Sequence, residues 1–138
     1  MRVYLGASAA MIAEHSRTGQ LAPGAEGFAA TAPLRAALGE IGDEDLEFAL
    51  SLAAAEASAA MAGVGPDGRG RRFVVVADVD AAAVEPAADN PGAVAVTTPV
   101  ALDRVDAVLA DPDDIAVHRG VSDELAWYAR QEIPDLLA

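Results

Sequence analysis

The sequence predicts an α+β fold, with a mostly antiparallel sheet of four to six strands and one long and two or three short helices packed on one face. Two observations predict this class. Short alternating or β-branched stretches, typical of strands, occur at the start of the chain and in its second half. Stretches with helical spacing lie between them. One strand, then helices, then several strands is an order that favours an antiparallel sheet.

The length and composition predict one folded domain. A chain of 138 residues has the size of one domain, and we expect residues 1–138 to form a single α+β domain. No repeat, heptad run or linker rich in proline, glycine or serine divides it. The chain has no cysteine, which excludes a disulfide framework, thiolate zinc and cysteine nucleophiles.

The first third of the chain predicts a strand followed by two short helices. In residues 2–5, Val3 and Leu5 fall on one side and Arg2 and Tyr4 on the other, as in a half-buried strand. A helix over 9–18 follows with Ser8 as its N-cap, and a hydroxyl and an early proline open a brief helix over 34–38. Between the two helices, residues 28–31 form either a short strand or an extended link.

Residues 43–62 predict the long helix. Acidic residues lie in its first turn, where a helix N-terminus is positive. Alanines raise its helix propensity and allow close packing. Apolar residues repeat at three- and four-residue spacing, and we expect this stripe to pack on the sheet: Leu46, Leu50, Ala53, Ala57 and Met61.

The second half of the chain predicts strands over 71–79, 92–98 and 102–109. The first contains a β-branched run that indicates a buried strand, and the second alternates. Residues 102–109 fit either a strand or a helix, and we prefer the strand. We expect residues 80–90 to form a loose surface connection and residues 111–114 to form a solvated turn.

The net charge of −13 disfavours anionic partners. Nucleic acids and anionic membranes gain their protein affinity largely from Lys and Arg, so we expect neither as a partner. The one basic cluster is Arg69, Arg71 and Arg72. The first residues contain no apolar run of signal-peptide length, and we expect a cytoplasmic protein. The acidity has two interpretations: it keeps the protein soluble, or it forms a surface that meets a basic partner.

Several segments resemble catalytic or ligand-binding motifs but lack the neighbouring elements or residues that those motifs require. The glycines of residues 63–68 match a dinucleotide fingerprint, but a predicted helix precedes them and a strand follows, which inverts the required order. The aspartates of 111–114 lack the glycine and glutamate of a calcium loop. Ser8 is expected to be a helix cap, and His15 and His118 are isolated and expected to be structural. We therefore expect no catalytic residue, no cofactor and no metal site.

The C-terminal segment carries the candidate binding residues. The only Trp and one of the two Tyr stand side by side in an aromatic-poor chain, and we take Trp127, Tyr128 and Glu132 as a candidate partner-binding set. Residues 122–130 fit a strand or a helix. On a strand, the two aromatic side chains point to opposite faces, so one is buried and the other stays exposed for a partner. We expect this segment to be ordered.

Segments spread over the chain share a recognisable pattern. They are Met1-Arg2-Val3-Tyr4-Leu5 with Ser8, Asp45-Leu46-Glu47-Phe48-Ala49, Val76-Ala77-Asp78-Val79, Trp127-Tyr128-Ala129 and Gln131-Glu132-Ile133-Pro134-Asp135-Leu136-Leu137. Together they resemble a family of small uncharacterised actinobacterial proteins. That family often has proline at the position of Arg130, which favours a strand over 125–129 because proline breaks a helix. The family has no assigned activity, so the resemblance implies no catalytic residue.

The function itself is not fixed by the sequence. We expect a non-catalytic cytoplasmic protein that acts through protein–protein contacts. A more specific version of this hypothesis is that the partner is basic. The alternative is a small enzyme or small-ligand-binding protein whose site the sequence does not locate. An exposed apolar patch rimmed by carboxylates would favour protein contacts, and a pocket of converging polar groups with shifted pKa values would favour the alternative. The oligomeric state stays open.

Overall fold

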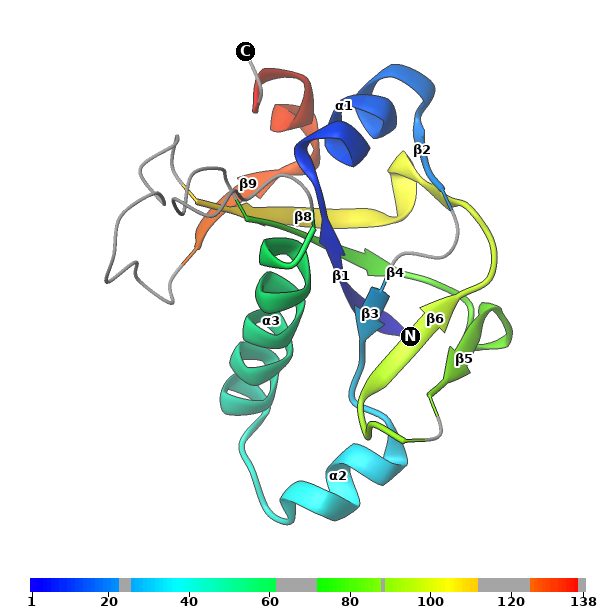
Figure 1. Ribbon diagram of the computed structural model, residues 1–138, viewed down its shortest axis with the longest axis vertical. Coiled ribbons are helices and arrows are strands. Elements are labelled where there is room, and N and C mark those ends of the chain that lie inside the picture. Colours follow the sequence, from blue (N-terminus) through cyan, green and yellow to red (C-terminus); the bar gives the residue numbers. More distant parts are fainter. Residues whose placement is uncertain (23–25, 62–71, 88, 112–124, 137–138) are drawn as a thin grey trace.

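The computed structural model describes residues 1–22, 26–61, 72–87, 89–111 and 125–136 (Figure 1). Helices and strands follow one another along the chain as β1 (Arg2–Ala7), α1 (Ala9–Thr18), β2 (Gln20–Leu21), β3 (Glu26–Phe28), α2 (Ala32–Leu38), α3 (Asp43–Ala59), β4 (Phe73–Asp78), β5 (Val84–Pro86), β6 (Ala93–Val96), β7 (Val100–Ala101), β8 (Val105–Ala110) and β9 (Ala126–Ala129). Three short 3-10 helices complete the described part: η1 (Ala81–Ala83), η2 (Leu102–Arg104) and η4 (Arg130–Asp135).

The strands form a seven-stranded antiparallel sheet in the order β5-β6-β3-β1-β4-β8-β9, and β2 pairs with β7 in a separate two-stranded sheet. The α+β class and the antiparallel pairing are confirmed. The expected count of four to six strands is too low. β2 and β7 have two residues each and β5 has three, so they are too short to show a periodic pattern. β5 lies within the predicted surface connection.

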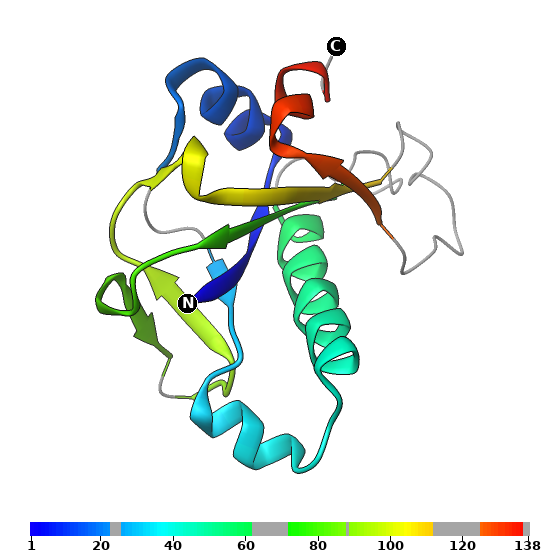
Figure 2. The same cartoon turned by 180° about the vertical axis from the view of Figure 1, so that it is seen from behind.

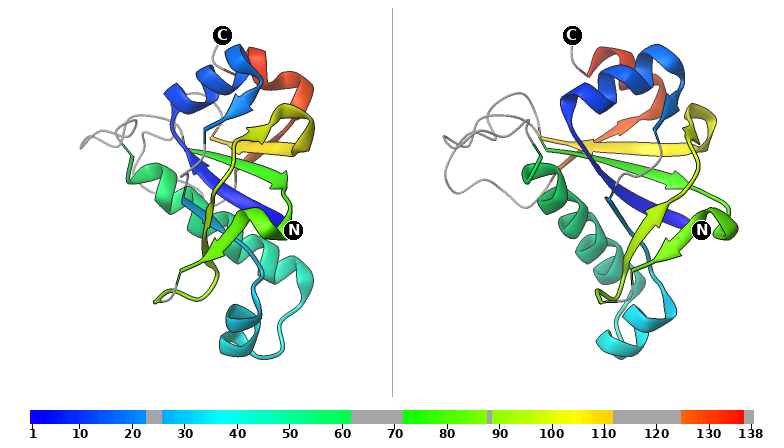
Figure 3. Two further views of the ribbon diagram at one scale, coloured as in Figure 1. Left: turned by 90° about the vertical axis from the view of Figure 1, so that its right-hand side faces the viewer. Right: turned by 45° about the vertical axis from the view of Figure 1, so that its right-hand side comes forward.

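The central strands β1 and β4 are covered on both faces, so the expectation that the helices pack on one face is wrong. Val3 and Leu5 belong to the cluster that includes Ile12 of α1 and Ile133 of η4. Tyr4, between them, belongs to the cluster of α3 on the other face. Successive side chains of a strand point to opposite faces, so an unbroken buried run signals cover on both sides. Figures 2 and 3 show α1 and η4 together, away from α3.

The helix α1 has the predicted bounds, and its two ends explain them. The Ser8 hydroxyl oxygen accepts a 3.2 Å hydrogen bond from the Met11 N–H, which satisfies a free donor of the first turn. Gly19 ends the helix with φ +78°, a left-handed conformation that glycine adopts without strain. Ile12 and His15 form the buried face of the helix.

The helix α3 ends at Ala59, earlier than the predicted residue 62. Leu46 and Leu50 are buried as expected, whereas Ala53 and Ala57 are half-buried. Met61 is also half-buried and lies beyond the helix. The stripe on the sheet instead continues through Ala54, Ala55 and Ser58. The predicted stripe is therefore right in its first half and rotated toward the neighbouring face in its second half.

Two segments with open alternatives are resolved by the structure. Residues 102–104 are a 3-10 helix and Val105–Ala110 is strand β8, so the preferred strand is confirmed for most of 102–109. Of residues 122–130, Ala126–Ala129 is strand β9, after which the chain turns into η4, and residues 122–124 lie outside the described residues. Ile133 of η4 is buried, so the expected docking of the terminus is present. Among the described residues, none of the helices combines the length and the apolar character that a membrane span requires.

The ends of β4 and β8 are joined by a buried ion pair. The guanidinium of Arg72 donates two hydrogen bonds, of 2.9 and 2.8 Å, to the carboxylate of Asp111, and the Arg72 backbone N–H adds a third of 2.9 Å. The Asp111 side chain is only 3% exposed. The expectation that Asp111 belongs to a solvated turn is wrong, because a fork of charged donors compensates its burial. Residues 112–114, the rest of that predicted turn, lie outside the described residues.

Candidate functional site

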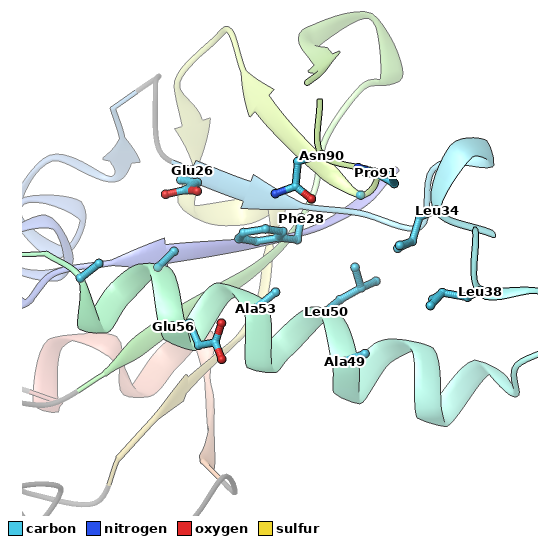
Figure 4. A pocket seen from close by; sticks show the side chains of 13 residues that line it. Glu26, Phe28, Leu34, Leu38, Ala49, Leu50, Ala53, Glu56, Asn90 and Pro91 are labelled. Atoms are coloured by element: carbon cyan, nitrogen blue, oxygen red, sulfur yellow. The ribbon is translucent and has the colours of Figure 1, made fainter. Parts of the chain in front are cut away.

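A groove of about 490 Å³ runs between α2, α3, β3 and the turn before β6 (Figure 4). One wall is the α3 face of small side chains, and Phe28 of β3 lies opposite it. The residues that line the groove are Glu26, Phe28, Leu34, Leu38, Ala49, Leu50, Ala53, Glu56, Ala57, Ala60, Asn90, Pro91 and Gly92.

The groove has an apolar end and an acidic end. Figure 4 shows Leu34, Leu38 and Leu50 together at one end, while Glu26 and Glu56 lie toward the other. Leu38 remains 44% exposed, so the apolar end is open to solvent. An exposed apolar patch with carboxylates at its rim is the feature expected of a surface for protein contacts. Here the patch is hollowed to a volume within the range of small-molecule sites.

A glycine and a row of alanines create this shape. Gly92 has φ +88°, a conformation that glycine adopts without strain, and a Cβ there would lie 2.9 Å from a methyl carbon of Leu34, so a larger residue would force that side chain to shift. On α3, Ala49, Ala53 and Ala57 leave space where larger side chains would fill the groove. Sequence reasoning did not find this site, because its residues come from four separate segments and none forms a motif.

The three candidate binding residues of the C-terminus do lie together. Trp127, Tyr128 and Glu132 line one pocket of about 340 Å³, with Asp135 and Leu136 as the other lining residues. We call these five residues the C-terminal pocket. It lies where edge strand β9 turns into η4, so the short sequence separation of its residues explains why a sequence pattern could find it.

The two aromatic side chains of the C-terminal pocket differ in burial. Tyr128 pairs with Val108 and packs partly against the core cluster of that face. Trp127 pairs with Leu109 and is 63% exposed, more than any other large apolar side chain in the described part of the chain. The opposite-face geometry expected for a strand is therefore present, with Tyr128 facing inward and Trp127 outward.

Glu132 has a structural contact as well as an exposed position. One of its carboxylate oxygens accepts a 3.0 Å hydrogen bond from the Ala129 N–H, which fixes the turn from β9 into η4. This bond uses one carboxylate oxygen of Glu132, and the residue lines the same pocket as Trp127 and Tyr128. Asp135, one turn further along η4, adds a second carboxylate to the same pocket.

A third hollow, of about 270 Å³, shares Leu50 with the groove. Arg2 and Arg35 line it together with Asp43 and Glu47, so its charges balance. Tyr4 also lines it, and burial raises the pKa of the Tyr4 phenol. Charged side chains in a hollow with a tyrosine of shifted pKa are what the small-ligand alternative leads us to expect, and the lining contains no histidine, serine or threonine.

The remaining sequence candidates that the structure describes have structural roles. Ser8 is a helix cap, and Arg72 is engaged by Asp111. His15 is fully buried, neither ring nitrogen has a hydrogen-bond partner within the described structure, and burial lowers its pKa. His118 and the loop 63–68 lie outside the described residues. Within the ranges that the structure describes, no three His, Asp or Glu side chains are placed to hold a metal ion.

Comparisons with known proteins identify a family without an assigned activity. No curated protein matches the chain, and no solved structure does. One family model matches, that of the family of unknown function DUF6912, and it covers residues 1–137. An uncharacterised family is what the resemblance in the sequence implied. Since the match spans nearly the whole sequence, the chain belongs to the family of unknown function DUF6912.

Proposed function

We propose that this protein is a non-catalytic cytoplasmic binding protein that recognises a basic partner protein through the C-terminal pocket. One observation carries the proposal: the most exposed large apolar side chain in the described structure, Trp127, lines one pocket with two acidic residues, Glu132 and Asp135. Tryptophan is strongly enriched among the residues that dominate binding energy at protein interfaces.

The chemistry of the C-terminal pocket selects a cationic group. An indole ring attracts Lys or Arg side chains through its face, by about 0.5–1 kcal/mol at exposed sites and about 2 kcal/mol when water is excluded. The two carboxylates add charge-assisted hydrogen bonds to the same group. The net charge of −13 favours approach of a basic surface over a long range.

The rigidity of the pocket also supports a binding role. Trp127 is part of a strand paired with β8, and the Ala129 N–H holds Glu132 in place, so binding orders few new groups. A preorganised surface loses less conformational entropy when a partner binds.

Site-specific photo-crosslinking tests the proposal. A photoreactive amino acid replaces Gln131, an exposed residue of η4 next to Glu132, in the protein expressed in its native cells, and a matched variant carries it at Phe48, which is 49% exposed on α3. We expect one dominant adduct with a basic protein from position 131, lost when Trp127 is also replaced by alanine, and none of the same kind from position 48. E132Q and D135N together should remove the adduct. Identical adducts from both positions, or an acidic partner, would contradict the proposal.

A further inference from the structure

We propose that the groove between α2 and α3 is a separate site that binds a small amphipathic amine, with its apolar body at the leucine end and its ammonium group toward Glu26 and Glu56. The inference does not depend on the C-terminal pocket. It gives the small-ligand alternative of the sequence analysis a location, on residues that no sequence motif connects.

The apolar end provides the affinity for a hydrocarbon chain. Leu34, Leu38 and Leu50 surround it, and the exposed part of Leu38 would be covered by a ligand. Covering apolar surface removes it from water and so stabilises a complex. The groove volume of about 490 Å³ lies within the usual range of small-molecule sites.

The acidic end selects a cation. Glu26 and Glu56 have no hydrogen bond or ion pair from their carboxylates within the described residues, and no Arg or Lys is among the residues that line the groove. The C-terminal end of α3 lies on the same side, and its last turn contains no basic residue. Free carbonyl groups give a helix C-terminus a partial negative charge, so the helix reinforces both carboxylates.

The distance between the two ends suits an extended ligand. The α3 wall runs from Ala49 to Ala60, which at 1.5 Å per residue is roughly 16 Å. Its alanines keep the wall shallow along this length, and Phe28 on the opposite side provides a flat apolar contact. Asn90 adds an amide that can accept a further hydrogen bond from an ammonium group.

Calorimetric titration with three matched probes tests the site: octylamine, 1-octanol and octanoate, each below the concentration at which it aggregates. We expect octylamine to bind most tightly and octanoate least. E26Q and E56Q together should weaken octylamine about tenfold or more, which is the change that loss of one charge-assisted hydrogen bond brings. E47Q removes a charge from α3 outside the groove and should leave the affinity unchanged.

A second pair of variants tests the location. A53L fills the groove and should abolish binding, whereas A36L adds the same side chain on the exposed surface of α2 and should not. The fluorescence of Trp127, the sole tryptophan, should stay constant during the octylamine titration because it lies in the other pocket.

Equal affinity for all three probes would overturn the proposal, as would unchanged octylamine binding by the E26Q/E56Q protein. Loss of octylamine binding in W127A would place the ligand in the C-terminal pocket and also overturn it. If A53L does not fold, as judged by circular dichroism, the carboxylate variants and the Trp127 signal still decide. None of these results depends on the identity of a partner protein, so the two proposals can fail separately.

Discussion

The hydroxyl of Ser58 donates a 2.6 Å hydrogen bond to the carbonyl oxygen of Ala7, which joins the buried face of α3 to the end of β1. The same oxygen accepts a 2.9 Å hydrogen bond from the Phe73 N–H at the start of β4. One side chain thus connects the helix to the ends of the two central strands.

We predict that S58A lowers the free energy of unfolding by roughly 1–3 kcal/mol, because the buried backbone groups lose a hydrogen-bond partner. Urea unfolding followed by circular dichroism measures it. The control is S51A: the Ser51 hydroxyl bonds to Phe48 O within α3 and is exposed, so its loss should cost less than about 0.5 kcal/mol. Equal costs for the two variants would contradict the prediction.

Gly6 lies at a close contact between β1 and α3. A Cβ at this position would lie 2.7 Å from the Ala54 carbonyl oxygen and 3.0 Å from the Ala57 Cβ. We predict that G6A destabilises the protein by about 1–3 kcal/mol, because the helix must move away from the sheet. A thermal melt checks this. An unchanged melting temperature would mean that α3 does not rest on β1.

His15 predicts a pH dependence of stability. Its pKa in the folded protein is lowered from 6.5 by burial, so the unfolded chain takes up the proton first as the pH falls below 6.5. The stabilising effect of the neutral ring is complete above pH 6.5 and is lost at up to about 1.4 kcal/mol per pH unit below it. We expect H15L to gain stability relative to the wild type as the pH falls from 7.5 to 5. Parallel curves in urea unfolding would show that the ring is not buried.

The ion pair of Arg72 and Asp111 predicts a large effect at the ends of β4 and β8. We expect D111A to lower the free energy of unfolding by about 3–5 kcal/mol, because it leaves a largely buried guanidinium without this carboxylate. Chemical denaturation measures the loss. The matched control is E14Q: the pair of Glu14 and Arg17 is well exposed, so its loss should cost less than about 0.5 kcal/mol. A cost for D111A near that of E14Q would place Asp111 in solvent.

Much of the fold could be predicted from local patterns. Alternation and β-branched runs predicted β1, β4, β6 and most of β8, and capping residues predicted α1 and α2. The short strands β2, β5 and β7 could not be predicted, since their pairing depends on contacts between distant segments. The expectation that the helices cover one face of the sheet was wrong because it did not take the sequence of β4 into account. The run Phe73–Asp78 is buried except for its last residue, and an unbroken apolar run of this kind indicates that both faces of the strand are covered.

The two candidate sites also differ in whether their residues are close in sequence. Trp127, Tyr128 and Glu132 are close in sequence, so one aromatic-rich segment pointed to the C-terminal pocket. The groove needs Gly92 to admit Leu34 and needs Ala53 to remain small, and neither requirement has a signature in the sequence. A hollow that exists because small residues line it cannot be found by searching a sequence for reactive side chains.

The central place of β1 has a consequence for the order of events at the ribosome. β1 is synthesised first, but the edge that pairs with β4 has no partner until Phe73–Asp78 has been made. At about 5–20 residues per second, the chain between Ala7 and Phe73 takes roughly 3–13 s to appear. Among the strands of the sheet, β3 alone can pair with β1 during this interval, along the other edge of β1. A ribosome-bound chain shorter than β4 therefore exposes an apolar strand edge to chaperones, and the sheet closes from its centre outward.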